Sequence, residues 1–242
     1  EEMHVKVLMN MQYAIEGGKV YVLEANPRAS RTVPLVSKVC NVRMVPLATQ
    51  IITSELTGKP SPVPELKEQK IPYYGVKEAA FPFNMFQEVD PVLGPEMRST
   101  GEVLGLSKSY GEAFYKAQEG VGAKLPLEGT VLISVNRKDK EEVVEVAKAF
   151  DQDGFKILAT NNTCKLLNEA GIKAEKVNKL SEGRPNILDL ITNGDIDIVV
   201  NSPVGKDSIH DDSYLRKGAI KAKIPYYTTI AAAKAAAEGI AY

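Results

Sequence analysis

Cysteine and histidine are scarce in this sequence of 242 residues, which has two of each, Cys40 and Cys164 and His4 and His210, far apart along the chain. A structural zinc site takes four such ligands at short spacings, and a disulfide framework takes several cysteine pairs, so both are excluded. The same scarcity leaves no Ser/His/Asp or Cys/His catalytic set to nominate. This cysteine usage is typical of a reduced, intracellular protein, and we expect a cytoplasmic location.

Long apolar runs and an excess of one charge are also missing. No stretch approaches the roughly 20 apolar residues of a membrane-spanning helix, and the N-terminus lacks a signal-peptide pattern. A net charge of −1 without a long basic run gives no footprint for nucleic acid or an anionic membrane. No glycine-rich phosphate loop of either common nucleotide-binding type is present. Any anion site must therefore be local.

What is there is an ordinary globular composition, 44% hydrophobic and 25% charged, enough for one large domain or two small ones. The chain opens almost directly into an alternating segment, as a piece of a longer polypeptide would. Two alternating segments around Gly17-Gly18 predict a β-hairpin. Its core face should carry the apolar residues of both strands, namely Met9, Met11, Tyr13, Ile15, Tyr21, Leu23 and Ala25.

This core face requires Gln12 to pair near Glu24, because a slip of one residue would bury Gln12. Gln12, Glu24 and Asn26 then project together from the polar face, with oxygen donors that suit Mg²⁺ or Mn²⁺. Arg28 and Arg31 follow on the next loop, where guanidinium groups could hold phosphoryl oxygens. The alternative is a solvated hairpin face in which Asn-Pro simply forms a turn.

The middle of the chain predicts a mixed α+β region. Residues 33–57 have helical periodicity, interrupted at Pro46 and stopped by Gly58. A proline-rich connector at 60–72 and an extended segment at 73–83 follow, and then a loop through residues 91–95. Ser109 and Glu112 predict a capping box for a helix that runs to Gly120. We place a domain boundary in the stretch 120–129, which is rich in Gly, Pro and Lys.

After that boundary, strands and helices alternate with short connections. We expect strands at 131–135, 155–159, 196–200 and 224–227, and helices at 140–150, 163–170, 184–192 with Pro185 in its first turn, 212–221 and 231–238. This rhythm predicts an α/β fold with a doubly wound parallel sheet, covered by helices on both faces. Such sheets bind ligands at the carboxyl ends of their strands.

Polar residues occupy these predicted strand ends, namely Asn136, Thr160, Asn201 and Thr228. The segment from Thr160 to Thr163 begins a helix, where free N–H groups and hydroxyls can hold a phosphate. Lys140, at another helix start, and Lys179, in a loop, could converge on the same anion. The alternative is that Asn162 and Thr163 only cap the helix.

Four stretches of the sequence carry a resemblance to a known family. They are 8–12 (LMNMQ), 24–34 (EANPRASRTVP), 93–103 (LGPEMRSTGEV) and 178–185 (NKLSEGRP). With these stretches, the chain closely resembles the C-terminal portion of the large subunit of carbamoyl phosphate synthase, over essentially its whole length. The resemblance implies two domains, the last part of an ATP-grasp unit at residues 1–122 and a methylglyoxal-synthase-like regulatory domain at residues 123–242.

The resemblance also implies a function for the first domain. ATP-grasp units of this kind phosphorylate carbamate to carbamoyl phosphate, for pyrimidine and arginine biosynthesis, with ATP as substrate and Mg²⁺ or Mn²⁺ as cofactor. Gln12, Glu24 and Asn26 match the family's metal ligands, while Arg28, and Arg31 beside it, match groups that hold the phosphorylated intermediate. The implied partners are the remainder of the large subunit, with the missing ATP-grasp lobes, and a glutaminase small subunit.

For the second domain the resemblance implies regulation by a nucleotide such as UMP or IMP. The positions that match the family's phosphate ligands are Lys140, Thr160, Thr163, Lys179 and Asn201, and those that match its ornithine contacts are Glu78 and Thr228. Ser202-Pro203 and Asn161-Asn162 depart from the family pattern, which leaves the effector's identity open. Two alternatives remain, a nucleotide-binding module that does not catalyse when isolated and a methylglyoxal synthase. Ser202 argues against the second, since that enzyme has an aspartate there.

Overall fold

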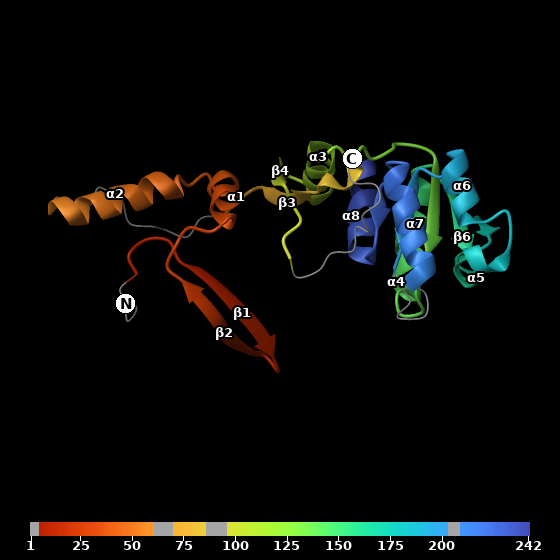
Figure 1. The fold of residues 1–242 in the computed structure, drawn as a ribbon, viewed down its shortest axis with the longest axis horizontal. Coiled ribbons are helices and arrows are strands. Elements are labelled where there is room, and N and C mark those ends of the chain that lie inside the picture. The colour runs from red at the N-terminus through yellow and green to blue at the C-terminus, as the bar shows by residue number, and fades with distance from the viewer. Residues whose placement is uncertain (1–4, 61–69, 86–95, 203–208) are drawn as a thin grey trace. The chain divides into compact units, whose positions relative to one another are not determined.

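The computed structural model of the protein describes residues 5–60, 70–85, 96–202 and 209–242 (Figure 1). The chain forms two compact units, Glu1–Tyr73 and Tyr74–Tyr242. Most of the predicted proline-rich connector, the loop through residues 91–95 and Pro203 lie outside the described residues. Within those residues, no helix combines the length and apolar character needed to cross a membrane.

The first unit consists of a hairpin followed by two helices. Strands β1 (Asn10–Glu16) and β2 (Lys19–Asn26) are joined at Gly17 and Gly18, whose φ angles of 54° and 76° suit a tight hairpin turn. Helix α1 (Thr32–Val39) and helix α2 (Met44–Thr57) follow, and α2 ends at the left-handed Gly58, as predicted. The predicted interruption at Pro46 is wrong. The break lies at residues 40–43, and Pro46 sits in the first turn of α2, where its missing N–H costs nothing.

The pairing of β1 with β2 confirms the predicted register at one end of the hairpin only. Gln12 lies opposite Glu24 and Asn10 opposite Asn26, but a β-bulge follows Gln12. Beyond the bulge Tyr13 faces Val22 and Ile15 faces Val20, so these valines share the apolar face where the sequence predicted Tyr21 and Leu23. The apolar residues beyond the bulge, Tyr13, Ile15, Val20 and Val22, are each more than half exposed.

The second unit begins with an antiparallel strand pair and a helix. The strands are β3 (Tyr74–Ala80) and β4 (Gly101–Ser107), and between them lies a short 3₁₀ turn, η1 (Pro82–Asn84). Helix α3 (Tyr110–Gly120) begins as predicted at Ser109, whose side-chain oxygen accepts a hydrogen bond from the Glu112 N–H at 3.2 Å. Glu112 does not complete a capping box, because its carboxylate bonds Ser107 and Lys116 instead.

A five-stranded parallel sheet forms the rest of this unit and confirms the predicted α/β fold (Figure 1). Its strands run in the order β7-β6-β5-β8-β9. In chain order the elements are β5 (Thr130–Ser134), α4 (Lys140–Gln152), β6 (Lys156–Thr160), α5 (Asn161–Glu169), β7 (Ala174–Val177), η2 (Leu180–Glu182), α6 (Ile187–Asn193), β8 (Ile198–Asn201), α7 (Ile209–Lys221), β9 (Tyr226–Tyr227) and α8 (Ile230–Ile240).

Alternate residues of the strands point into two hydrophobic cores, one on each face of the sheet. Val131, Ile133 and Ile157 pack with buried residues of α4, α5 and α8, while Leu132 and Val199 pack with those of α6 and α7. The sheet is thus covered on both faces, as a parallel sheet requires. The edge strand β7 was not predicted, because its charged centre, Glu175-Lys176, hides the apolar pattern.

Two boundaries differ from the sequence predictions. The compact units divide after Tyr73 rather than at residue 122, because α3 packs closely against α8. A Cβ on Gly111 would lie 2.6 Å from the Glu238 carbonyl oxygen. The helix predicted from Arg184 begins only at Ile187, so Pro185 precedes it. Asn186 is the N-cap, and its side-chain oxygen accepts hydrogen bonds from the first turn of α6.

Candidate functional site

A pocket of about 400 Å³ lies at the carboxyl ends of β5, β6 and β7. It is lined by the loop after β5, the first turn of α5 and the segment after β7. Four of the residues that the sequence predicts for phosphate binding line it together, namely Lys140, Thr160, Thr163 and Lys179. The βαβ connections bring them to one edge, since the strands of a parallel sheet all end on the same side of the sheet.

The charge in this pocket is not balanced by the protein. Arg137, Lys140 and Lys179 line it, and none of the three forms an ion pair with another described residue. Arg137 was missed by sequence reasoning, which looked only at strand ends and helix starts. Glu182 is the one acid among the lining residues, and its carboxylate accepts a hydrogen bond from the Lys179 backbone N–H at 3.0 Å. The pocket therefore has a surplus of positive charge.

The first turn of α5 adds backbone donors to this charge. Thr160 is the N-cap residue, but no side chain caps the helix, and the Thr160 hydroxyl instead donates to the Ser134 hydroxyl oxygen at 3.2 Å. Asn162 and Thr163 lie inside the helix rather than at the capping position. The capping alternative is thus not what the structure shows. The first turn of α5 lines the pocket, and no side chain accepts a hydrogen bond from its N–H groups at the cap.

Asn201 lies at the same edge of the sheet but outside the pocket lining. It ends β8, next to β5, and is only 2% exposed. Its side-chain amide donates to the Tyr226 hydroxyl on β9 at 2.7 Å. The next residue, Ser202, accepts a hydrogen bond from the backbone N–H of Asn136 at 3.0 Å. Asn136 belongs to the pocket lining, so the end of β8 is tied directly to the pocket loop.

Glu78 and Thr228 do not line the pocket either. Glu78 is half-buried on β3, where burial raises the pKa of its carboxyl, and the Gln118 side-chain amide donates to it at 3.1 Å. Thr228 follows β9 directly and is exposed. Beside them lies Tyr227, which sequence reasoning missed. It is 6% exposed, its ring contacts that of Phe114, and its hydroxyl has no hydrogen-bond partner among the described residues.

The predicted metal ligands lie on the hairpin of the first unit. Gln12 is directly opposite Glu24, and Asn26 is two residues further along β2, so the register permits all three side chains to share a face. One carboxylate and two amides fit a hard cation that takes its other ligands elsewhere. Arg28 donates from its guanidinium to the Ala29 carbonyl oxygen at 3.0 Å, and Arg31 is the N-cap residue of α1. Among the described residues, no three His, Cys, Asp or Glu side chains gather into a metal-binding group.

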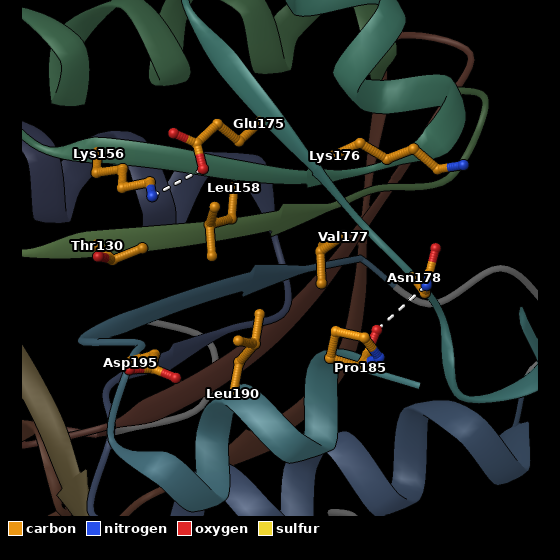
Figure 2. Close-up of a pocket in the computed structure, with 10 residues that line it drawn as sticks. All are labelled: Thr130, Lys156, Leu158, Glu175, Lys176, Val177, Asn178, Pro185, Leu190 and Asp195. Carbon is orange, nitrogen blue, oxygen red and sulfur yellow. Dashed lines mark hydrogen bonds and ion pairs between the residues drawn. The ribbon is translucent and has the colours of Figure 1, made fainter. Parts of the chain in front are cut away.

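A second pocket, of about 420 Å³, lies between α6 and the strands β6 and β7 (Figure 2). Leu158, Val177 and Leu190 contribute its apolar lining. Lys156 at one end forms an ion pair with Glu175 at 2.7 Å, so that its charge is compensated (Figure 2). Lys176 also lines this pocket and forms no ion pair with another described residue, but Asn186 caps the adjacent helix α6. This pocket therefore lacks the combination of unpaired cations and an uncapped helix N-terminus that the pocket at β5–β7 has.

Comparison with known proteins identifies relatives of the whole chain. Residues 142–228 match the family of MGS-like domains. The chain is 45% identical over 255 residues to the "Carbamoyl phosphate synthase large chain, C-terminal section" of Aquifex aeolicus, covering 98% of this chain and 47% of the relative. It is 49% identical over 237 residues to the "Carbamoyl phosphate synthase large chain" of Acidobacterium capsulatum, covering 97% of this chain and 22% of the relative. The chain thus spans half or less of the curated relatives that it matches.

Among solved structures, a methylglyoxal synthase from Elizabethkingia anophelis is 19% identical, with a TM-score of 0.38, over 45% of this chain and 76% of that one. The relatives that match nearly the whole of this chain, together with the domain match, confirm the resemblance found in the sequence. The parallel sheet confirms the fold expected for its MGS-like domain.

Proposed function

Because this chain is a relative of the C-terminal section of the carbamoyl phosphate synthase large chain, we propose that it works within that enzyme, and that its pocket at β5–β7 binds the phosphate of a regulatory nucleotide. The effector class proposed is a nucleoside monophosphate such as UMP or IMP. A monoester phosphate carries a charge of about −1.5 to −2 at neutral pH, which the surplus charge of the pocket complements.

One observation carries this proposal, the meeting of three unpaired cations with an uncapped helix N-terminus. Each phosphate oxygen can accept several hydrogen bonds, and here the donors come from Lys140, Lys179, the Thr163 hydroxyl and the first N–H groups of α5. The helix dipole adds roughly half a positive charge at the same point. In the empty pocket these cations repel one another, so an anion gains from all of them at once.

Calorimetry on the chain with UMP and IMP tests the site. Lys179→Ala should weaken binding about 10- to 100-fold, the effect of losing one hydrogen bond to a charged group. Lys156→Ala is the matched control, because Lys156 lines the other pocket and is neutralised by Glu175. If neither nucleotide produces heat of binding, or if the two substitutions weaken binding equally, the result argues against an effector site here.

The hairpin supports a further part of the proposal, carbamate phosphorylation within the assembled enzyme. Gln12, Glu24 and Asn26 would hold Mg²⁺ or Mn²⁺, which would neutralise ATP phosphate charge when bound. Arg28 and Arg31 lie on the loop that follows, where their guanidinium groups would hold phosphoryl oxygens. In the isolated chain one carboxylate and two amides bind such a cation weakly, so we propose that the chain alone binds nucleotide without catalysing.

The remainder of the large chain is the proposed partner of the first unit, with a glutaminase small subunit completing the enzyme. The apolar hairpin face of Tyr13, Ile15, Val20 and Val22 is exposed, and covering it would gain about 25 cal/mol per Å².

The intact assembly offers the test of the catalytic part. Glu24→Ala should abolish carbamate phosphorylation and leave nucleotide binding unchanged, while Glu16→Ala, further along β1, should affect neither. A fully active Glu24→Ala enzyme would refute the metal assignment. The methylglyoxal synthase alternative predicts turnover of dihydroxyacetone phosphate by the chain, and we expect none.

A further inference from the structure

Arg137 is an exposed cation in the loop between β5 and α4, and it lines the pocket at β5–β7. Within the described part of the chain, its guanidinium group forms neither an ion pair nor a hydrogen bond. Its neighbour Lys138 is also exposed but does not line the pocket. Of these two nearby cations, only Arg137 therefore belongs to the pocket.

The pocket lining also contains a buried polar group without a partner. Thr163 is 1% exposed, and its hydroxyl forms no hydrogen bond with another described residue. Burying a hydroxyl without a hydrogen bond is unfavourable, so this group favours a ligand that can accept one from it. The hydroxyl points to an acceptor-rich ligand independently of the helix N-terminus and of the cations.

The charges of the lining match one ionisation state of a phosphate. Arg137, Lys140 and Lys179 contribute three positive charges and Glu182 contributes one negative charge, which leaves a net charge of about +2. A phosphate monoester in its fully ionised form is a dianion, whereas a diester or a protonated monoester is a monoanion. The lining with Arg137 thus balances a dianion, and the lining without Arg137 would balance a monoanion.

The neighbouring elements do not alter this balance. The first turn of α5 contributes the neutral Asn161 and Asn162 to the lining. Asp139 adjoins the loop of Arg137 but is not a lining residue, and its carboxylate accepts a hydrogen bond from the Asn136 side chain at 2.7 Å. Arg137 is therefore the group whose presence decides between the two ligand charges.

Resting on the proposed effector site, we propose that Arg137 makes this pocket select the dianion of a phosphate monoester over singly charged phosphates. A guanidinium group can hold two phosphoryl oxygens with parallel N–H donors, and a monoester offers three such oxygens. The Coulomb energy between Arg137 and the ligand is proportional to the charge of the ligand. Loss of Arg137 therefore costs a dianion about twice the free energy that it costs a monoanion. Arg137 is thus a specificity-determining residue.

Calorimetry of the full chain with UMP and with the methyl ester of its phosphate tests this role. Arg137→Gln should weaken binding of UMP about ten-fold and binding of the methyl ester about three-fold, so that the preference for UMP falls about three-fold. Arg137→Lys keeps the charge and should keep most of the preference. Lys138→Gln removes the same charge beside the pocket and should leave both affinities nearly unchanged.

The pH dependence of binding gives a second readout, which a merely structural role of Arg137 would not alter. The second pKa of a phosphate monoester is about 6, so only about a tenth of UMP is dianionic at pH 5. The affinity of the wild type for UMP should therefore fall by up to about ten-fold from pH 7.5 to pH 5, and the affinity of Arg137→Gln should fall less. The methyl ester keeps its single charge over this range, so its affinity corrects for any titration of the pocket itself.

The outcomes separate the role of Arg137 from the effector site. If the wild type binds UMP and Arg137→Gln leaves that affinity unchanged, or weakens UMP and its methyl ester by the same factor, the role of Arg137 alone is overturned. An equal loss of preference in Lys138→Gln also overturns it, because the effect would then come from the general charge of the surface. If the wild type binds neither ligand, the effector site and this role are overturned together.

Discussion

The two adjacent tyrosines of β9 should respond oppositely to loss of their hydroxyl groups. The Tyr227 hydroxyl is buried and has no partner among the described residues, whereas the Tyr226 hydroxyl accepts a hydrogen bond from Asn201. Burying a hydroxyl without a hydrogen bond costs about 1–3 kcal/mol, and a made hydrogen bond contributes about 1 kcal/mol. We therefore expect Tyr227→Phe to stabilise the second unit by about 1–2 kcal/mol, and Tyr226→Phe to destabilise it by about 1 kcal/mol.

Thermal unfolding of the chain, followed by far-UV circular dichroism, measures both effects. In a domain of 150–250 residues, 1 kcal/mol shifts the midpoint by about 2–4 °C, so the two variants should differ by about 4–12 °C. Both substitutions keep the ring and its packing, which limits the comparison to the hydroxyl groups. A midpoint that falls in Tyr227→Phe would show that this hydroxyl has a partner and would refute the reasoning.

Two further predictions concern β3 and β4. Burial raises the pKa of Glu78, so its carboxylate destabilises the fold above that pKa and no longer does so below the unfolded value near 4.5. The Glu78→Gln variant should therefore have a higher denaturant concentration at its unfolding midpoint than the wild type at neutral pH, but not at pH 4. An equal increase of the midpoint at both pH values would contradict this. Gly105→Ala should lower the free energy of unfolding, measured with urea, by about 3 kcal/mol or more, because the added Cβ would collide with the Ala113 carbonyl oxygen of α3. Gly101→Ala on the same strand, whose Cβ meets nothing closer than 3.9 Å, should cost little.

The α/β fold was predictable because its signals are local and repeated. The strands of a buried sheet are short apolar runs, and here these runs contain Val131, Ile133, Ile157 and Ile198. Helices with one apolar stripe separate the strands along the chain. Strand β7 was missed because an edge strand is short and half its residues, such as Glu175, face solvent. The late start of α6 was missed because Asn186 caps it better than the upstream Arg184.

The candidate site was predictable where position along the chain determines position in space. The end of β6 and the starts of α4 and α5 bring Thr160, Lys140 and Thr163 together by topology alone. The directions in which individual side chains point were not predictable in this way. Whether Asn201 faces the pocket or Tyr226 depends on a contact with β9, and the hairpin bulge that exchanges Tyr21 and Leu23 for Val20 and Val22 leaves no local pattern.

The cations that line the pocket at β5–β7 differ from those surface lysines of the second unit that pair with an acid. Lys156 forms an ion pair with Glu175, and Lys234 forms one with Glu145. Because the protein itself neutralises these two charges, an anion would gain little by binding there. Among the described residues, Lys140 and Lys179 form no ion pair, and no side chain caps the helix beside them, so we expect this arrangement to cost stability when the pocket is empty. A ligand that binds only the folded state stabilises it by RT ln(1 + [L]/Kd), which is about 2.7 kcal/mol when the ligand concentration is 100 times Kd. The electrostatics that make the empty pocket unfavourable would therefore make it responsive to the concentration of the proposed nucleotide effector.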